Sequence, residues 1–376
     1  MITLQSAPPS LAQADRFSHA ETWNAAGVPW DSAEQKSLLC CRVQNETHDV
    51  KTFVFSTPDV CAVSFEPGQF ITVTAQIDGQ PVSRCYTLSS SPTRPFTLAI
   101  TVKRVPGGVV SNWLHDNLVA GSRLQASGPA GVFTALAGTA QKSLYLSAGS
   151  GITPLMSMSR ASVDLGLDRD IVFLHSARTP ADLIFRAELL AMQQVSGGFR
   201  VVQVCESKGG EEGWQGALGR LDMMLLQQAV PDLHEREVFT CGPPLYMAAV
   251  RRLLQEAGYD MARYHQESFD IAACDEPPVS PSTSADQQAS TYTVRLARSG
   301  KTFSMDAQQT VLAAAKKAGA VVPSSCSQGV CGTCKTALLE GTVEMNHNGG
   351  IRQREIDKGM RLLCCSKPTS DLVIDL

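Results

Sequence analysis

The sequence lacks long apolar runs and a strong excess of charge of either sign. No stretch approaches the roughly 20 apolar residues that a membrane-spanning helix needs, and the densest runs, LYLSAG and DIVFLHS, have only the length of a buried strand. The 32 basic and 36 acidic side chains leave a formal net charge of −4. This balance indicates neither nucleic-acid binding nor attraction to an anionic membrane, so neither partner is expected.

The first residues, MITLQSAPPS, lack the basic region and the apolar region of a secretory signal. We therefore expect a cytoplasmic protein. Cysteine, in contrast, is abundant, with twelve in 376 residues. Disulfides are disfavoured in the cytoplasm, so clustered cysteines there more often bind metal or carry out redox chemistry. Seven are scattered, and most of these are expected to be small buried apolar residues, whereas five crowd into the C-terminal segment.

The chain is long enough for two or three domains, and its patterning divides it into five segments. Residues 1–35 show no sustained period and are expected to form a loosely held tail. Short β-rich runs alternate with turns over 36–138, which predicts an antiparallel β-barrel. Over 139–270, buried strands alternate with helical stretches such as PLMSMSRASVDL and PADLIFRAELLAMQQV, which predicts an α/β domain with a parallel sheet. Residues 271–290 have the composition of a linker, and 291–376 form a compact last module.

The last module contains PSSCSQGVCGTCK followed by RLLCCSKP. Its spacing is the C-x4-C-x2-C…C plan of plant-type [2Fe–2S] ferredoxins, which use thiolates because iron in a sulfide-bridged cluster prefers soft anionic ligands. A zinc site is the alternative, but such sites usually pair two short knuckles, and the second knuckle is missing. We therefore expect an α+β (β-grasp) ferredoxin domain, with the ligands Cys326, Cys331, Cys334 and Cys364.

The fourth ligand is ambiguous, because Cys364 and Cys365 are adjacent. Plant-type ferredoxins place a proline four positions after the last ligand, and Pro368 fits that position for Cys364. Cys365 would then be a buried bystander.

The stretch SRCYTLSSSP in the predicted barrel resembles the R-x-Y-[ST]-x-x-S element of the ferredoxin–NADP reductase superfamily. Arg84 can neutralise a flavin phosphate, Tyr86 can stack on the isoalloxazine ring, and the Thr87 hydroxyl can hydrogen-bond near N5. Taken alone, these residues fit an ordinary barrel strand equally well.

The next stretch, ITVKRVPGGVVSNWLHDNL, places glycines at the expected start of a helix. Backbone N–H groups at a helix N-terminus bind phosphate readily. The loop resembles that of FAD-binding members of the superfamily, whereas FMN-binding dioxygenase reductases tend to carry an arginine in this loop. It therefore favours FAD over FMN, with the candidate contacts Val102, Lys103, Gly107, Gly108, Val109, Val110 and Ser111.

Two loops of the α/β domain are candidate nicotinamide sites. SLYLSAGSGITPLMSM gives a glycine turn between a strand and a helix and ends in proline, as in the same superfamily; such a turn alone is weak evidence. VFTCGPPLYM resembles the superfamily's second nicotinamide signature, although Cys241 could also be a core residue. The candidate contacts are Gly149, Gly151, Ile152, Thr153, Pro154, Cys241, Gly242 and Pro243.

Two further segments leave alternatives open. In HSARTP, Ser176 and Arg178 could hold a 2′-phosphate and favour NADPH, but Arg178 could equally stack on adenine or lie in solvent. In YHQESFD, Glu267 and Phe269 close the domain, where Phe269 could shield the flavin or belong to the core. The candidate catalytic residues are Tyr86, Thr87, Thr153 and Cys241.

Together these motifs resemble the reductase components of two-component Rieske oxygenases, and most closely the glycine betaine monooxygenase reductases. The stretches GQPVSRCYTLSSSP, ITVKRVPGGVVSN, FLHSARTPADLIF and VEMNHNGGI carry the resemblance. It implies that electrons pass from NAD(P)H, with NADH favoured, through FAD and a [2Fe–2S] cluster to a Rieske-type oxygenase. That oxygenase would demethylate glycine betaine or a similar quaternary amine.

Two alternatives remain at this point. One is a reductase for another acceptor, such as hybrid-cluster protein or a phenylacetyl-CoA-type oxygenase. The other is a non-enzymatic zinc-binding module.

Overall fold

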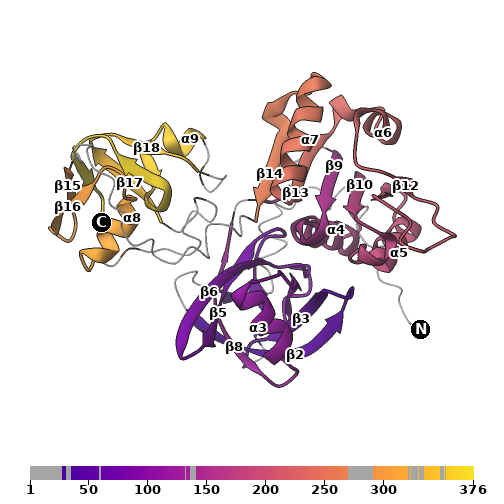
Figure 1. The fold of residues 1–376 in the computed structure, drawn as a ribbon, viewed down its shortest axis with the longest axis horizontal. Coiled ribbons are helices and arrows are strands. Elements are labelled where there is room, and N and C mark those ends of the chain that lie inside the picture. The colour runs from indigo at the N-terminus through magenta and orange to yellow at the C-terminus, as the bar shows by residue number, and fades with distance from the viewer. Residues whose placement is uncertain are drawn as a thin grey trace, which may run out of the picture.

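The computed structural model shows three lobes, coloured indigo to purple, magenta to salmon, and orange to yellow in Figure 1. Each lobe has its own hydrophobic core. None of the helices in the described part of the chain combines the length and the apolarity that crossing a membrane requires. The structure describes residues 28–30, 35–58, 61–131, 133–135, 141–269, 291–320, 322, 329, 334–347, 351 and 353–376.

The first lobe is a six-stranded antiparallel sheet in the order β6-β5-β8-β2-β3-β7. A bridge between Leu88 and Ile100 connects the residue after β6 with β7, which closes the sheet into a barrel around an apolar core. The barrel elements are β2 (Gln35–Asn45), β3 (Val50–Ser56), β5 (Phe70–Ile77), β6 (Gln80–Thr87), β7 (Leu98–Lys103), α3 (Val109–Asn117) and β8 (Arg123–Ala130).

Part of the segment predicted as a tail lies against the barrel. Strand β1 (Val28–Pro29) pairs in parallel with β4 (Val63–Ser64). Trp30 follows with 6% of its surface exposed and belongs to the barrel core. A buried indole removes as much apolar surface from water as any large core side chain. Packing therefore holds residues 28–30 against the barrel.

The second lobe is a parallel sheet with the order β12-β11-β10-β9-β13-β14. One face packs on α4 and α5, and the other packs on α6 and α7. The chain order runs β9 (Lys142–Ala148), α4 (Ile152–Asp164), β10 (Asp170–Ala177), α5 (Arg186–Val195), β11 (Phe199–Cys205), β12 (Ala217–Leu218), α6 (Met223–Ala229), β13 (Glu237–Gly242), α7 (Pro244–Glu256) and β14 (Tyr264–Ser268).

The helix expected over PADLIFRAELLAMQQV is interrupted. A 3-10 turn covers Pro180–Asp182, and α5 begins only at Arg186. The side chains of Thr179 and Asp182 each bond the backbone of the other residue, which forms a capping box for the turn. Phe185 takes the left-handed conformation, with a φ of 56°. Because that conformation stops an α-helix, the helical composition of the stretch does not produce one continuous helix.

The third lobe is a mixed sheet with the order β16-β15-β21-β17-β19, crossed by one helix. This is the α+β arrangement expected for a ferredoxin module. Its elements are β15 (Thr291–Leu296), β16 (Thr302–Asp306), α8 (Val311–Lys317), β17 (Lys335–Glu340), β18 (Val343–Met345), α9 (Gln353–Ile356), β19 (Met360–Leu362), a 3-10 turn η5 (Leu363–Cys365), β20 (Ser366–Pro368) and β21 (Leu372–Ile374).

Candidate active site

The predicted flavin residues lie along β6. Arg84 and Tyr86 are half-buried and lie on one face of the strand, because side chains alternate along it. Thr87, at the end of the strand, is buried. Burial raises the pKa of the Tyr86 phenol far above its usual range. Tyr86 is therefore a neutral aromatic side chain that can stack on a flat ring.

The glycine loop before α3 fits a pyrophosphate. Gly107 has a φ of 75°, and a Cβ added there would meet no atom within 4 Å, so the backbone can be approached closely. Gly108 is the N-cap of α3, with no capping side chain and no acidic residue in the first turn. The first N–H groups of the helix can therefore donate to an anion, which the helix dipole also favours at this end.

The glycine loop after β9 fits a second phosphate group. It forms a 3-10 turn, η1 (Gly149–Gly151), and α4 follows with no capping side chain and no acid in its first turn. A Cβ on Gly151 would lie 2.3 Å from the Cys241 carbonyl oxygen. Only glycine therefore lets this turn pack against the end of β13. A Cβ on Gly149, in contrast, would meet only open space, which leaves room for a ligand.

Three strand ends bring the remaining candidates together at one edge of the parallel sheet. In register, Cys241 on β13 lies beside Ser147 on β9 and beside Glu267 on β14. The Cys241 side chain has no exposed surface, and burial raises the pKa of its thiol well above the usual value. Cys241 is therefore a neutral thiol. Thr153, near the start of α4, is also buried, and its hydroxyl donates to the Ser150 carbonyl at 3.1 Å.

Glu267 is a site residue to which the sequence assigned no chemical role. Only 5% of its surface is exposed, and burial raises the pKa of its carboxyl from 4.5 to about 8. A hydrogen bond from Thr87 opposes this shift and links the two lobes, while the Oε2 atom of Glu267 has no hydrogen-bond partner among the described residues. An acidic residue near the carboxyl end of the last strand, YHQES, is the sequence signal that could have found it. Phe269, which follows, is half-buried.

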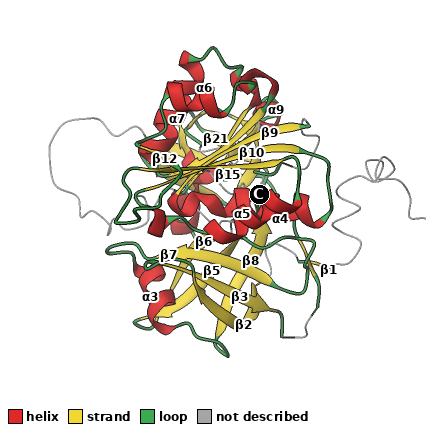
Figure 2. Ribbon diagram, turned by 90° about the vertical axis from the view of Figure 1, so that its right-hand side faces the viewer, coloured by secondary structure: helices red, strands yellow, loops and turns green. Residues whose placement is uncertain are grey.

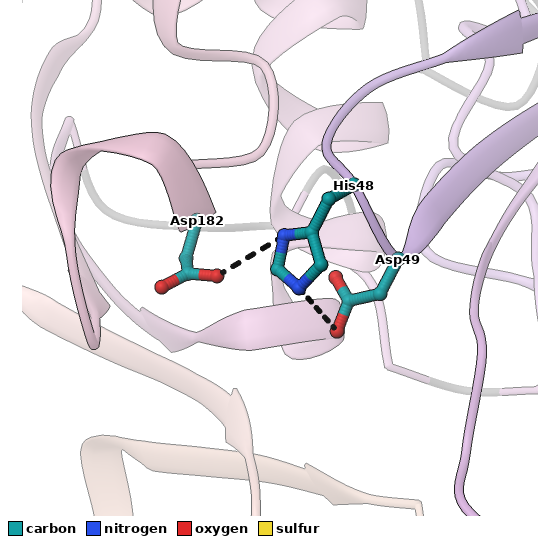
Figure 3. A group of neighbouring side chains, drawn as sticks. All are labelled: His48, Asp49 and Asp182. Carbon is teal, nitrogen blue, oxygen red and sulfur yellow. Dashed lines mark ion pairs between the residues drawn. The ribbon is translucent and has the colours of Figure 1, made fainter. Parts of the chain in front are cut away.

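Figure 3 shows an ion-pair cluster where the barrel meets the α/β lobe. His48 lies 3.8 Å from Asp49 and 3.7 Å from Asp182. Arg178 lies 3.9 Å from Asp49 and 3.7 Å from Asp182, and Lys103 lies 2.8 Å from Asp49. The predicted contacts Lys103 and Arg178 are therefore both paired with carboxylates. The three residues drawn have the spacing of a metal site, but these cations already balance the acids.

The described part of the cysteine loop fits a sulfur-ligated cluster. Cys334 and Cys364 are buried, and the Cys364 N–H donates to the Cys334 Sγ at 3.4 Å. The Gly329 N–H donates to the Cys364 Sγ at 3.1 Å. Such N–H donors stabilise thiolates. The Cys365 Sγ instead points to the Leu362 carbonyl oxygen at 3.6 Å. The predicted ligands Cys326 and Cys331 lie outside the described residues.

Three family models match the three lobes. They are an oxidoreductase FAD-binding domain over residues 40–134, an oxidoreductase NAD-binding domain over 145–252 and a 2Fe-2S iron-sulfur cluster binding domain over 294–369. The chain is 45% identical over 352 residues to the glycine betaine monooxygenase reductase subunit of Pseudomonas aeruginosa, covering 90% of this chain and 94% of that one. It belongs to the family of oxygenase reductase subunits.

Other relatives agree with this membership. The reductase is 42% identical to the stachydrine N-demethylase reductase subunit of Rhizobium meliloti, covering 90% of this chain and 95% of the relative. Among solved structures, phthalate dioxygenase reductase matches with a TM-score of 0.57 and 26% identity, covering 91% of this chain and 98% of that one. The expected fold, with FAD-binding, NAD-binding and 2Fe-2S domains, is confirmed, and so is the prediction of an NAD(P)H-dependent oxidoreductase.

Proposed function

We propose that this reductase transfers electrons from NADH to a partner Rieske oxygenase that demethylates glycine betaine or a similar quaternary amine. The observation that carries the proposal is the contact between Thr87 of the flavin strand and Glu267 of the nucleotide sheet. This contact supports a flavin site that lies beside a nicotinamide site. The buried Cys334 and Cys364 lie in the same chain and supply a one-electron exit.

A bound FAD would supply the conversion between the two-electron chemistry of a nicotinamide hydride and the one-electron chemistry of a [2Fe–2S] cluster. The chain's own residues bind and orient these groups. We assign the α3 N-terminus and Arg84 to the FAD phosphates, and Tyr86 to the ring. The neutral Glu267 carboxyl holds its proton near Thr87 at ordinary pH, so no negative charge opposes the incoming hydride.

The pairing of Arg178 supports NADH over NADPH. A 2′-phosphate beside Arg178 would also lie close to the Asp49 and Asp182 carboxylates, which are within 4 Å of the guanidinium. These carboxylates offset the charges of Arg178 and Lys103, so the cluster has little net attraction for a 2′-phosphate, whereas the uncharged ribose of NADH needs none. Measuring kcat/KM with both cofactors tests the assignment. We expect a higher kcat/KM for NADH than for NADPH, and a smaller ratio of the two values in Asp49→Asn. A higher wild-type kcat/KM for NADPH would contradict the assignment.

The relatives support the choice of oxygenase substrate. Glycine betaine and stachydrine, the compounds in the names of two relatives, are both quaternary ammonium carboxylates. The reductase does not bind this substrate itself, so the test needs the partner. Purified reductase, NADH and the candidate Rieske oxygenase should release formaldehyde from glycine betaine. Omitting either protein should abolish release, and reduction of the cluster without any demethylation would reject this substrate class.

We further infer that the protein works in the cytoplasm. The buried Cys40 and Cys205 are thiols, as is usual in a reducing compartment, and NADH is supplied there. Fractionation of cells that produce the protein would test the location.

A further inference from the structure

Helix α4 connects one candidate cofactor site with the chain segment that follows the other. Its N-terminus follows the glycine turn η1, and Figure 2 shows α4 between the parallel sheet and the barrel. Ser157, Arg160 and Asp164 are three and four positions apart, so they share one face of the helix. Their barrel partners all lie in residues 89–94, directly after the flavin strand β6.

The contacts on this face are specific and mostly buried. The Ser157 hydroxyl donates to the Ser90 carbonyl at 2.7 Å, and the Arg160 guanidinium donates to the Ser89 carbonyl. Asp164 accepts two bonds from Arg94, at 3.0 and 2.7 Å. Because Ser89 and Ser90 are buried, the bonds of Ser157 and Arg160 connect the interiors of two lobes, whereas the pair of Asp164 with Arg94 lies at the surface.

Arg160 is held in place from a second direction. Its guanidinium donates to both carboxylate oxygens of Glu188 on α5, at 2.8 and 2.6 Å, and lies 4.6 Å from the centre of the Phe185 ring. Only 11% of its side chain is exposed. Bidentate pairing and stacking on an aromatic ring leave the side chain little freedom. The bond to Ser89 is therefore made by a group that α5 has already oriented.

We propose that Arg160 is a positioning residue that holds the flavin strand at a fixed distance from the nicotinamide turn. Arg160 bonds Ser89, which lies two residues after Thr87. The glycine turn η1 lies at the opposite end of α4. The inference rests on the proposed function, since it assumes that hydride crosses between these two loops. Hydride transfer depends steeply on the separation of the reacting atoms, and a displacement of about 1 Å can cost on the order of 100-fold in rate.

The test compares Arg160→Met with Arg186→Met. Arg186 makes the same kinds of contact inside the nucleotide lobe, because it donates to both carboxylate oxygens of Glu211 and lies 5.2 Å from the Trp214 ring centre. It has no bond to residues 89–94 among the described contacts. The measurements on FAD-loaded protein are the rate of flavin reduction by NADH, the KM for NADH, and the long-wavelength charge-transfer absorbance of stacked flavin and nicotinamide rings.

We expect Arg160→Met to lose most of the charge-transfer absorbance and to slow flavin reduction at least about tenfold. The KM for NADH should stay within about threefold, because the phosphate-binding turn itself is intact. Arg186→Met should keep the wild-type absorbance and rate. Wild-type absorbance and rate in Arg160→Met, or equal losses in both variants, would overturn the proposal.

Two milder variants decide the matter if Arg160→Met does not retain FAD. Arg160→Lys keeps the charge but cannot bond Ser89 and both Glu188 oxygens at once, and Ser157→Ala removes only the neighbouring bond to Ser90. A weakened charge-transfer absorbance in both supports the inference, and wild-type absorbance in both refutes it. A wild-type protein whose flavin NADH does not reduce would instead reject the proposed function, whatever these variants do.

Discussion

Glu267→Gln should remove a pH dependence that the wild-type reductase owes to this single buried carboxyl. The carboxyl pKa rises from 4.5 to about 8 because of burial. At about 1.36 kcal/mol per unit, the change corresponds to about 5 kcal/mol of unfolding free energy. This free energy is an upper value, because water that enters the site would solvate the carboxylate and reduce the pKa shift.

The sign follows from the two states of the chain. Below pH 4.5 the carboxyl is neutral in both states and contributes no pH dependence. Between pH 4.5 and 8 it ionises only in the unfolded chain, so the unfolding free energy falls as the pH rises. From pH 5 to 8 the loss is about 4 kcal/mol. Above pH 8 the cost stays constant, because the group is ionised in both states.

Glutamine does not titrate, so Glu267→Gln should not show this loss. Urea unfolding of the FAD-loaded protein, followed by flavin fluorescence at several pH values from 5 to 9, measures the difference. A matched control is Glu237→Gln, at the other end of β13, where the acid lies 3.5 Å from His265 and is partly exposed. Parallel stability profiles for the wild type and Glu267→Gln would refute the reasoning.

The same titration should appear in the chemistry. A carboxylate that forms beside the flavin above pH 8 repels the negative charge that a hydride brings, so the rate of flavin reduction should fall there. In Glu267→Gln the rate should not change over this range. Rapid-mixing measurements with NADH check this, and a fall near pH 8 that persists in the glutamine variant would assign it to another group.

Three further predictions concern the other sites. Cys364→Ser should abolish the visible iron–sulfur absorbance while Cys365→Ser retains it, because the Cys364 Sγ accepts from the Gly329 N–H of the loop and the Cys365 Sγ donates to the Leu362 carbonyl; the opposite result would make Cys365 the ligand. Gly151→Ala should raise the KM for NADH at least about tenfold, because its Cβ would overlap the backbone of β13, and an unchanged KM would exclude this turn from the site. Asp232→Asn should cost about 1 kcal/mol of stability in thermal unfolding, because it weakens one charged pair of the buried Arg236, which keeps Asp170 as a partner; an unchanged melting temperature would show that the pair contributes nothing.

Local motifs could be predicted from the sequence because their chemistry depends on neighbouring residues. The glycines before α3 and α4, and the spacing of Cys334 from Cys364, follow from what a phosphate or a cluster needs of a short segment. Register across the sheet could not be predicted in this way. Glu267 lies beside Cys241 only because β14 pairs with β13, and it meets Thr87 only because two lobes pack together.

Arg178 illustrates the same limit. Its position directly after β10 and its charge suggested a phosphate contact. Its electrostatic surroundings, however, include Asp49, which lies in a turn of the other lobe. A cation beside two carboxylates no longer attracts an anion as an isolated arginine would. If Arg178 contacts the cofactor as proposed, specificity depends on the contact between lobes, which no single motif reports.

The residues between the lobes follow a simple pattern along the chain. Residues 89–94 come shortly after Thr87, the proposed flavin residue, and α4 comes directly after η1, the proposed nicotinamide turn. The contacts that join the lobes are thus attached to the ends of the two cofactor motifs. Substitutions within one motif should change how tightly its cofactor binds. Substitutions at Arg160 or Ser157 should change how fast hydride crosses, because they alter the separation of the motifs and leave each motif intact.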